Sequence, residues 1–122
     1  SEFHKHTKVL LTNPTLFARD RHLCAYCGFT HVNHRFFSRD HIVPRSRGGV
    51  DEWTNVVTAC IPCNQEKGAK TLNESGMSLL YVPYAPNHYE NMILKNKRIL
   101  DDQMEYLLTG VPKHSRVWWP TV

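Results

Sequence analysis

The four cysteines of this chain form two pairs with the same spacing, and this pattern limits the fold more than any other feature. Cys24 and Cys27 stand in CAYCG, and Cys60 and Cys63 stand in CIPCN. Two thiolates at C-x2-C spacing lie on one tight turn that directs both sulfurs to a common point, and two such turns complete a tetrahedral zinc site. We therefore expect a four-sulfur zinc site that joins two distant parts of the chain.

Two disulfides or one redox-active pair are the alternative uses of these cysteines. A disulfide framework is typical of secreted proteins, and no secretory signal is visible in the sequence. A closed site of four thiolates leaves no position for water, so this zinc would hold the fold and take no part in catalysis. Its binding would supply about 10 kcal/mol of folding free energy, by analogy with zinc-finger peptides.

Length and charge set broad limits on the class of protein. The 122 residues, 41% of them hydrophobic, are enough for one domain with a modest core. Fifteen Lys and Arg residues against 11 Asp and Glu residues give a formal net charge of +4, a mild bias toward polyanions. No apolar run reaches the ~18 residues that a membrane span needs. We expect no membrane association.

The segment between the cysteine pairs predicts a strand, a long loop, a second strand and a helix. The first strand is expected over about 36–43, and Pro44 ends it before the turn RSRGG. NVVTAC has the β-branched content of a second strand, and CNQEKG predicts a two-turn helix that ends near Gly68. This order gathers polar residues from the strand ends and the helix, namely Asp40, His41, Asn55, Asn64 and Lys67.

These side chains are chemically sufficient for hydrolysis of a phosphodiester. The carboxylate of Asp40 and the amide oxygen of Asn64 are hard ligands suited to Mg²⁺ or Mn²⁺. A histidine beside them that is not a ligand, His41, can accept a proton from water, and such general-base catalysis contributes about 10²–10⁴ in rate. Phosphate groups would be held by the nearby cations, which are Arg45, Arg47 and Lys67.

The stretches DHIVPRSRGG, DEWTNVV and CNQEKG together resemble the signature of HNH endonucleases in their four-cysteine form. The resemblance covers about 17–71 and implies a small α+β fold, a ββα-metal (His-Me finger) core stapled by zinc. It implies that His41 is the general base, that Asp40 is a metal ligand and that Asn55 supports the loop and orients the base. The third family position, often histidine, is Asn64, as in the H-N-N variant, and this favours Mg²⁺.

The resemblance implies a metal-dependent DNA endonuclease that leaves 5′-phosphate and 3′-hydroxyl ends. We expect a structural zinc, a catalytic Mg²⁺ or Mn²⁺, double-stranded DNA as the partner, a bacterial cytoplasmic location, and a monomer or homodimer. Two alternatives stay open, a non-catalytic zinc-stabilised nucleic-acid-binding module and a nuclease that acts on RNA. Contacts to the DNA backbone are expected from Arg39, Arg45 and Arg47.

The segments on either side of this unit are expected to support it. NPTLFARDRHLC predicts a helix with Asn13 as its cap and Pro14 in its first turn, with Leu16 and Phe17 facing inward. Arg19 and Arg21 are expected on a solvated face or within reach of DNA, and His31 and His34 on a loop surface.

Apolar periodicity predicts further helices after the nuclease unit. NESGMSLL predicts a short helix, and residues 87–108 predict the longest helix, packed across the zinc module. The opening residues Ser-Glu-Phe resemble a cloning remnant. We divide the chain into 1–12, a tag remnant or N-terminal extension; 13–72, the nuclease core; and 73–122, a C-terminal helical extension.

Overall fold

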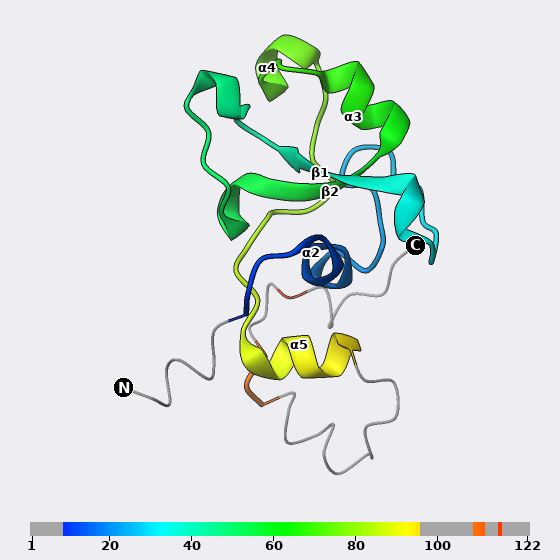
Figure 1. Cartoon of the computed structure of the whole chain (residues 1–122), viewed down its shortest axis with the longest axis vertical. Helices are drawn as coiled ribbons and strands as arrows, with labels where there is room; N and C mark the ends of the chain where they lie inside the picture. The colour runs from blue at the N-terminus through cyan, green and yellow to red at the C-terminus, as the bar shows by residue number, and fades with distance from the viewer. Residues whose placement is uncertain (1–8, 96–108, 112–114, 116–122) are drawn as a thin grey trace.

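The fold is a small α+β arrangement around a two-stranded antiparallel sheet (Figure 1). The computed structural model describes residues 9–95, 109–111 and 115. In these parts no helix is long and apolar enough to cross a membrane. The elements, in chain order, are helix α2 (Asn13–Arg19), turn η1 (His34–Phe36), strand β1 (Phe37–His41), turns η2 (Arg45–Arg47) and η3 (Trp53–Asn55), strand β2 (Val56–Cys60), and helices α3 (Ile61–Lys67), α4 (Leu72–Ser75) and α5 (His88–Lys95).

The two strands and helix α3 form the ββα unit that the sequence predicts. β1 and β2 pair in antiparallel register from Phe37 opposite Cys60 to His41 opposite Val56. Helix α3 follows β2 without a loop and lies on one side of the sheet, whereas α2 lies on the other side (Figure 1). β1 is shorter than expected because residues 42 and 43 already bend away toward the loop.

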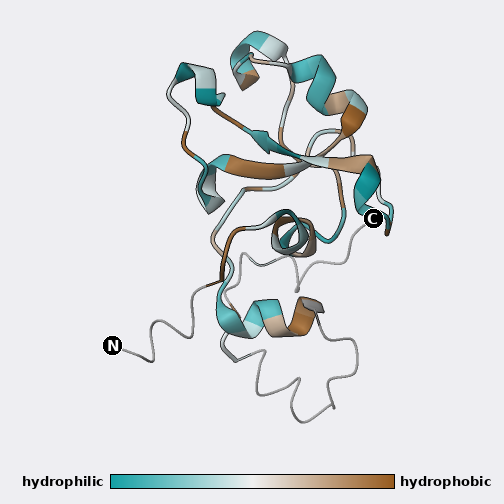
Figure 2. Cartoon of the chain, in the orientation of Figure 1, coloured by the Kyte–Doolittle hydropathy of each residue, from teal (hydrophilic) through white to brown (hydrophobic). Residues whose placement is uncertain are grey.

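The hydrophobic core lies between α2 and the sheet and includes part of the cysteine cluster. All five residues of β2 are buried, and Figure 2 shows hydrophobic residues gathered along this strand. Leu16 and Phe17 on α2 are buried as predicted. The core residues are Leu16, Phe17, Cys24, Phe37, Val56, Ala59 and Cys60. Metal ligands and core are therefore one structural unit.

The cap of α2 differs from the prediction by one residue. Thr12 is the N-cap, because its hydroxyl accepts from the backbone of Thr15 while the Thr15 hydroxyl accepts from the backbone of Thr12. Pro14 lies in the first turn as expected. Asn13 has a different contact, since its side-chain oxygen accepts from Arg39 Nε at 2.9 Å.

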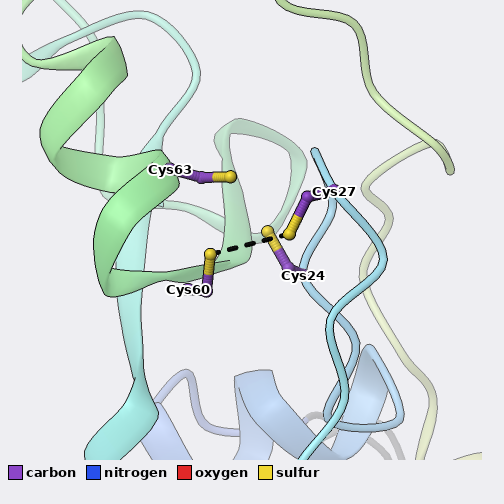
Figure 3. A group of neighbouring side chains, drawn as sticks. All are labelled: Cys24, Cys27, Cys60 and Cys63. Carbon is purple, nitrogen blue, oxygen red and sulfur yellow. Dashed lines mark hydrogen bonds between the residues drawn. The ribbon is translucent and has the colours of Figure 1, made fainter.

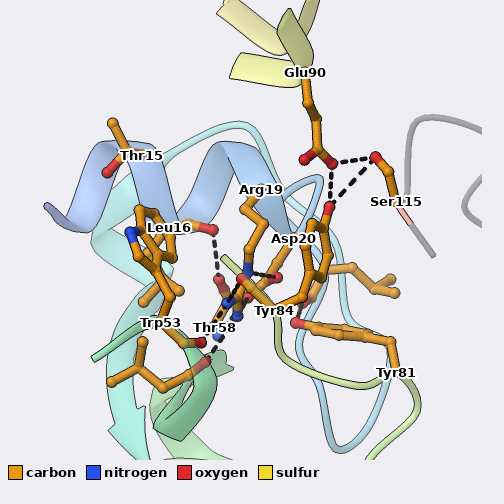
Figure 4. A network of polar contacts seen from close by, with 12 residues as sticks. Thr15, Leu16, Arg19, Asp20, Trp53, Thr58, Tyr81, Tyr84, Glu90 and Ser115 are labelled. Carbon is orange, nitrogen blue, oxygen red and sulfur yellow. Dashed lines mark hydrogen bonds and ion pairs between the residues drawn. The ribbon is translucent and has the colours of Figure 1, made fainter. Parts of the chain in front are cut away.

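Arg19 is buried, which corrects the expectation of a solvated or DNA-facing side chain (Figure 4). Its guanidinium is paired with Asp20 and donates to the carbonyl oxygens of Trp53, Tyr84 and Val56, each at 2.7 Å. A guanidinium can be buried only when its several donors are satisfied, and here they are. Arg19 thereby joins α2, the entry to β2 and the segment after α4. Its neighbour Arg21 is exposed.

The short helix after α3 begins and ends earlier than predicted. Thr71 caps α4 in a capping box with Glu74, and Gly76 ends the helix in a left-handed conformation at φ 72°. Residues 77–80 are therefore not helical.

Helix α5 (His88–Lys95) lies in the first part of the segment 87–108, over which the sequence predicts a long helix. It packs against α2 on the side away from α3, and not across the zinc module (Figure 1). Glu90 on α5 is buried and accepts from the Tyr84 hydroxyl, which attaches the helix to the core (Figure 4). The remainder of the predicted helix, over 96–108, lies outside the described residues.

Candidate functional site

The four cysteines lie within metal-binding distance of one another (Figure 3). Cys24 and Cys27 lie on the turn after α2, Cys60 ends β2 and Cys63 is in α3, and their sulfurs are all within 4.8 Å of each other. All four are free thiols. The Cys27 and Cys60 sulfurs are 3.7 Å apart, and a tetrahedral zinc with bonds of about 2.3 Å requires sulfurs about 3.8 Å apart. This donor set fits one structural zinc ion.

The surroundings of the cluster shift the pKa values of its thiols in different directions. Burial raises the pKa of Cys60 and that of Cys63. Burial also opposes ionisation of Cys24, but hydrogen bonds from the backbone at Cys27, Cys60 and Tyr26 lower its pKa overall. Among these bonds, the Tyr26 N–H donates to the Cys24 sulfur at 3.4 Å. Backbone groups from both cysteine pairs thus already donate to Cys24, and such hydrogen bonds favour the thiolate form that binds a metal.

The side chains of β1 that face α3 include the predicted metal ligand. Side chains alternate along a strand, so Ser38 and Asp40 share one face. Asn64 of α3 donates to the Ser38 hydroxyl at 2.8 Å, which leaves its amide oxygen free of any hydrogen bond to the described residues. Asp40 is buried, 3.4 Å from the Lys67 ammonium, and also accepts from the Tyr26 hydroxyl.

Tyr26 stays protonated in this environment. Burial and the hydrogen bond to Asp40 raise its pKa well above the usual value. It is therefore a permanent donor to one carboxylate oxygen of Asp40, and the lone pairs that remain on that carboxylate are available to a cation.

The opposite face of β1 carries the predicted base. His41 Nε2 lies 2.8 Å from Asp51 Oδ1, and Arg39 Nη1 lies 2.9 Å from each oxygen of the same carboxylate. Hydrogen bonds from Arg39 and His41 hold the pKa of Asp51 below its ordinary value. The sequence predicts that Arg39 contacts the DNA backbone. In the structure its side chain is only 20% exposed and is engaged in an ion pair with Asp51.

Asn55 closes the loop between the strands. Its side-chain oxygen accepts from Val43 N at 3.0 Å, and its amide donates to the carbonyls of Val43 and Val50 at 3.1 and 2.9 Å. Gly49 lies directly inside this closure, since a Cβ there would be 1.7 Å from the Val43 carbonyl oxygen. Asn55 makes no hydrogen bond to His41 in the described structure, and its contacts hold the loop that follows the base.

A hollow of about 260 Å³ opens beside these residues. Asp40, His41 and Asn64 all line it, although they come from different faces of β1 and from α3. The complete lining is Arg39, Asp40, His41, Pro44, Arg45, Asn64, Gly68 and Ala69. The sequence-predicted metal ligands and base thus meet at one small polar hollow, with arginines at its rim.

The three other cations expected to hold phosphate differ in their burial and in their ion pairs. Lys67 has no exposed surface and donates to the His41 carbonyl at 2.9 Å, so its side chain lies behind the site and not at the surface where phosphate was expected. Arg47 is exposed and ion-paired with Glu74. Arg45 is exposed, lines the hollow and forms no ion pair with the described residues.

Two residues at the site, Tyr26 and Asp51, were missed by the sequence reasoning. Tyr26 is one of the two residues between Cys24 and Cys27. Asp51 stands ten positions after His41, and no periodicity in the sequence links the two. The only available signal was their chemical type within otherwise assigned motifs.

The fold and the site together define a ββα unit with a four-cysteine cluster that fits zinc, and with an acid, a histidine and an amide around one hollow. Residues 24–80 match the family model described as HNH endonuclease. The match gives the family to which this part of the chain is similar, and the four clustered cysteines fit a zinc-stabilised HNH domain. A search of curated proteins and a search of solved structures each found no match.

Proposed function

We propose that the protein is a metal-dependent DNA endonuclease in which His41 activates the attacking water. The observation that carries this proposal is the hollow lined jointly by Asp40, His41 and Asn64. The family match supports nuclease activity in general, and the basic rim at Arg45 supports a phosphate backbone as the substrate.

His41 is the proton acceptor in this proposal. Its side chain is 18% exposed, so the imidazole reaches solvent while its Nε2 is held by Asp51. A base must approach the water within hydrogen-bond reach, and the ring lies at the wall of the hollow where a phosphate would enter. Asn55 holds the loop that follows, so the base sits on a supported backbone.

Asp40 and Asn64 would hold the catalytic divalent ion. The fit rests on their donor chemistry, since a carboxylate and an amide oxygen facing one hollow are the ligands that Mg²⁺ or Mn²⁺ prefers. A bound ion would supply Lewis-acid stabilisation of the charge that develops on the phosphate. Tyr26 and Lys67 fix the carboxylate that receives it.

The zinc and the chain divisions have supporting roles in the proposal. Zinc on the four cysteines keeps α3, and with it Asn64, against β1. We propose residues 13–72 as the nuclease unit, with 1–12 and 73–122 as extensions. We further propose double-stranded DNA as the substrate, 5′-phosphate and 3′-hydroxyl ends, action as a monomer or homodimer, and a cytoplasmic location.

Nicking of supercoiled plasmid by zinc-loaded protein, with and without Mg²⁺ or Mn²⁺, tests the proposal. We expect divalent-dependent nicking that His41→Ala abolishes and that His31→Ala leaves intact. His31 is the matched control, because it is an exposed histidine that does not line the hollow, and its ring contacts Phe29, Phe36 and the Asn33 backbone. Equal plasmid binding without cleavage under any metal would favour a binding module, and cleavage of RNA alone would reassign the substrate.

A further inference from the structure

The carboxylate of Asp51 lies between two side chains of the same strand face. His41 Nε2 is 2.8 Å from Oδ1, and Arg39 Nη1 is 2.9 Å from both oxygens. Residues 39 and 41 are two positions apart on β1, so their side chains point the same way and meet one acceptor. Asp51 reaches them from the loop that Asn55 closes at Val50.

An ionised carboxylate can only accept hydrogen bonds, and this decides which nitrogen of His41 carries the proton. The bonds from Arg39 and His41 keep the pKa of Asp51 low, so the group is ionised at neutral pH. Nε2 must then be the protonated nitrogen, and Nδ1 keeps its lone pair. Nδ1 has no hydrogen-bond partner within the described part of the chain.

We propose that Asp51 is the positioning residue of the site, and that it sets His41 in the tautomer whose Nδ1 takes the proton from water. The inference rests on the proposed function, in that it names the atom of the base. Asp51 itself does not touch the substrate, and it acts through the imidazole.

Arg39 completes this arrangement. It compensates the negative charge of Asp51 close to where a phosphate would lie, and it fixes the plane of the carboxylate. Its Nε donates to Asn13 Oδ1 at 2.9 Å, so the guanidinium is held in turn by the first turn of α2. Orientation of the base thereby depends on residues from α2, β1 and the loop.

Replacement by asparagine and by alanine should have different consequences. In Asp51→Asn, Arg39 can only donate, so the amide oxygen turns toward Arg39 and the NH₂ group toward His41. Nε2 must then accept, and the hydrogen moves to Nδ1, which blocks the base. In Asp51→Ala the ring is free and both tautomers are populated. A role in packing alone would give the opposite order, because asparagine preserves shape better than alanine.

The test compares Asp51→Asn, Asp51→Ala and Glu52→Gln in zinc-loaded protein. Glu52 is the matched control, an exposed acid next in the chain whose side chain only accepts from Thr54. We expect single-turnover nicking to fall about 10–100-fold in Asp51→Ala and further, by up to about 10⁴-fold, in Asp51→Asn. Plasmid affinity should stay equal or increase in both, because a negative charge is removed. Parallel losses of affinity and cleavage, or the reverse order of the two variants, would overturn the proposal.

A second measurement, by NMR spectroscopy, tests this inference independently of whether the protein cleaves DNA. Long-range ¹H–¹⁵N spectra of ring-labelled protein, recorded at the alkaline end of a pH series where the ring shifts no longer change, report the tautomer directly. We expect the Nε2–H form of His41 in the wild type and the Nδ1–H form in Asp51→Asn. An Nδ1–H wild type would refute the positioning role even if the protein cleaves DNA. If the wild type cleaves nothing but shows the expected tautomers, the proposed function fails and the Asp51–His41 relation stands.

Discussion

Lys67 places a positive charge in the interior, beside a buried carboxylate. Its ammonium is 3.4 Å from Asp40 and 2.9 Å from the His41 carbonyl, and the side chain has no exposed surface. Taking such a cation out of water is unfavourable unless a counter-charge and acceptors replace the lost hydration. At the scale of single residues, the lysine is therefore a structural partner of the proposed metal ligand.

Substitution of Lys67 tests that assignment. We expect Lys67→Met to lower the free energy of unfolding by about 3–5 kcal/mol, since it leaves Asp40 buried without its cation. Urea unfolding of the zinc-loaded protein measures this, with the exposed Lys70→Met as the control. Unchanged stability together with weaker DNA binding would instead support the direct phosphate contact expected from the sequence.

The loop between β1 and β2 begins directly after the proposed base, which is the last residue of β1. Asn55 closes it with three hydrogen bonds, and Gly49 permits the chain to pass against the Val43 carbonyl. The neighbouring Gly48 has a left-handed backbone, at φ 89°, but open space around its Cβ position. The two adjacent glycines are therefore needed for different physical reasons.

A pair of alanine substitutions separates these reasons. Gly48→Ala should cost roughly 1–2 kcal/mol of stability through its left-handed backbone and keep the loop closed. Gly49→Ala should cost more and reduce nicking at least about 10-fold, because a displaced Val43 carbonyl breaks the closure next to the proposed base. Urea unfolding and amide hydrogen exchange of residues 43–50 provide the measurements. Equal effects of both substitutions would contradict this account of the loop.

For the whole molecule, the cysteine cluster and the hydrophobic core cannot be separated. Cys24 and Cys60 are buried members of the core, and the thiols bridge the turn after α2 to the junction of β2 and α3. A small core supplies limited stability by itself, so cross-linking of these segments by one ion has a large effect.

Removal of zinc should therefore unfold the described fold. Structural zinc contributes about 10 kcal/mol or more, which is comparable with the whole stability of a domain at about 5–15 kcal/mol. Circular dichroism during titration with a strong chelator should show cooperative loss of structure that added Zn²⁺ reverses. Cys63→Ser should behave like the chelated protein. The prediction would be contradicted by a fold that persists without metal in a protein whose mass shows that two disulfides have formed.

Much of the fold could be predicted because its signals are local. The spacing of each cysteine pair, the β-branched run of β2 and Gly68 after α3 act within a few residues, and the structure agrees with them. Errors arose where a local preference had two solutions. Thr12 and Asn13 are both good caps, and the capping box with Thr15 decided between them.

The sequence by itself determined the four-cysteine cluster, the ββα order and the types of residue that meet at the hollow. Only the tertiary structure decided that Arg19 is interior, that Lys67 lies behind Asp40 and that Asp51 holds His41. The physical reason is that burial and long-range pairing depend on strand register and on the path of a closed loop. Both are set by contacts between residues far apart in the chain, for which no local periodicity exists.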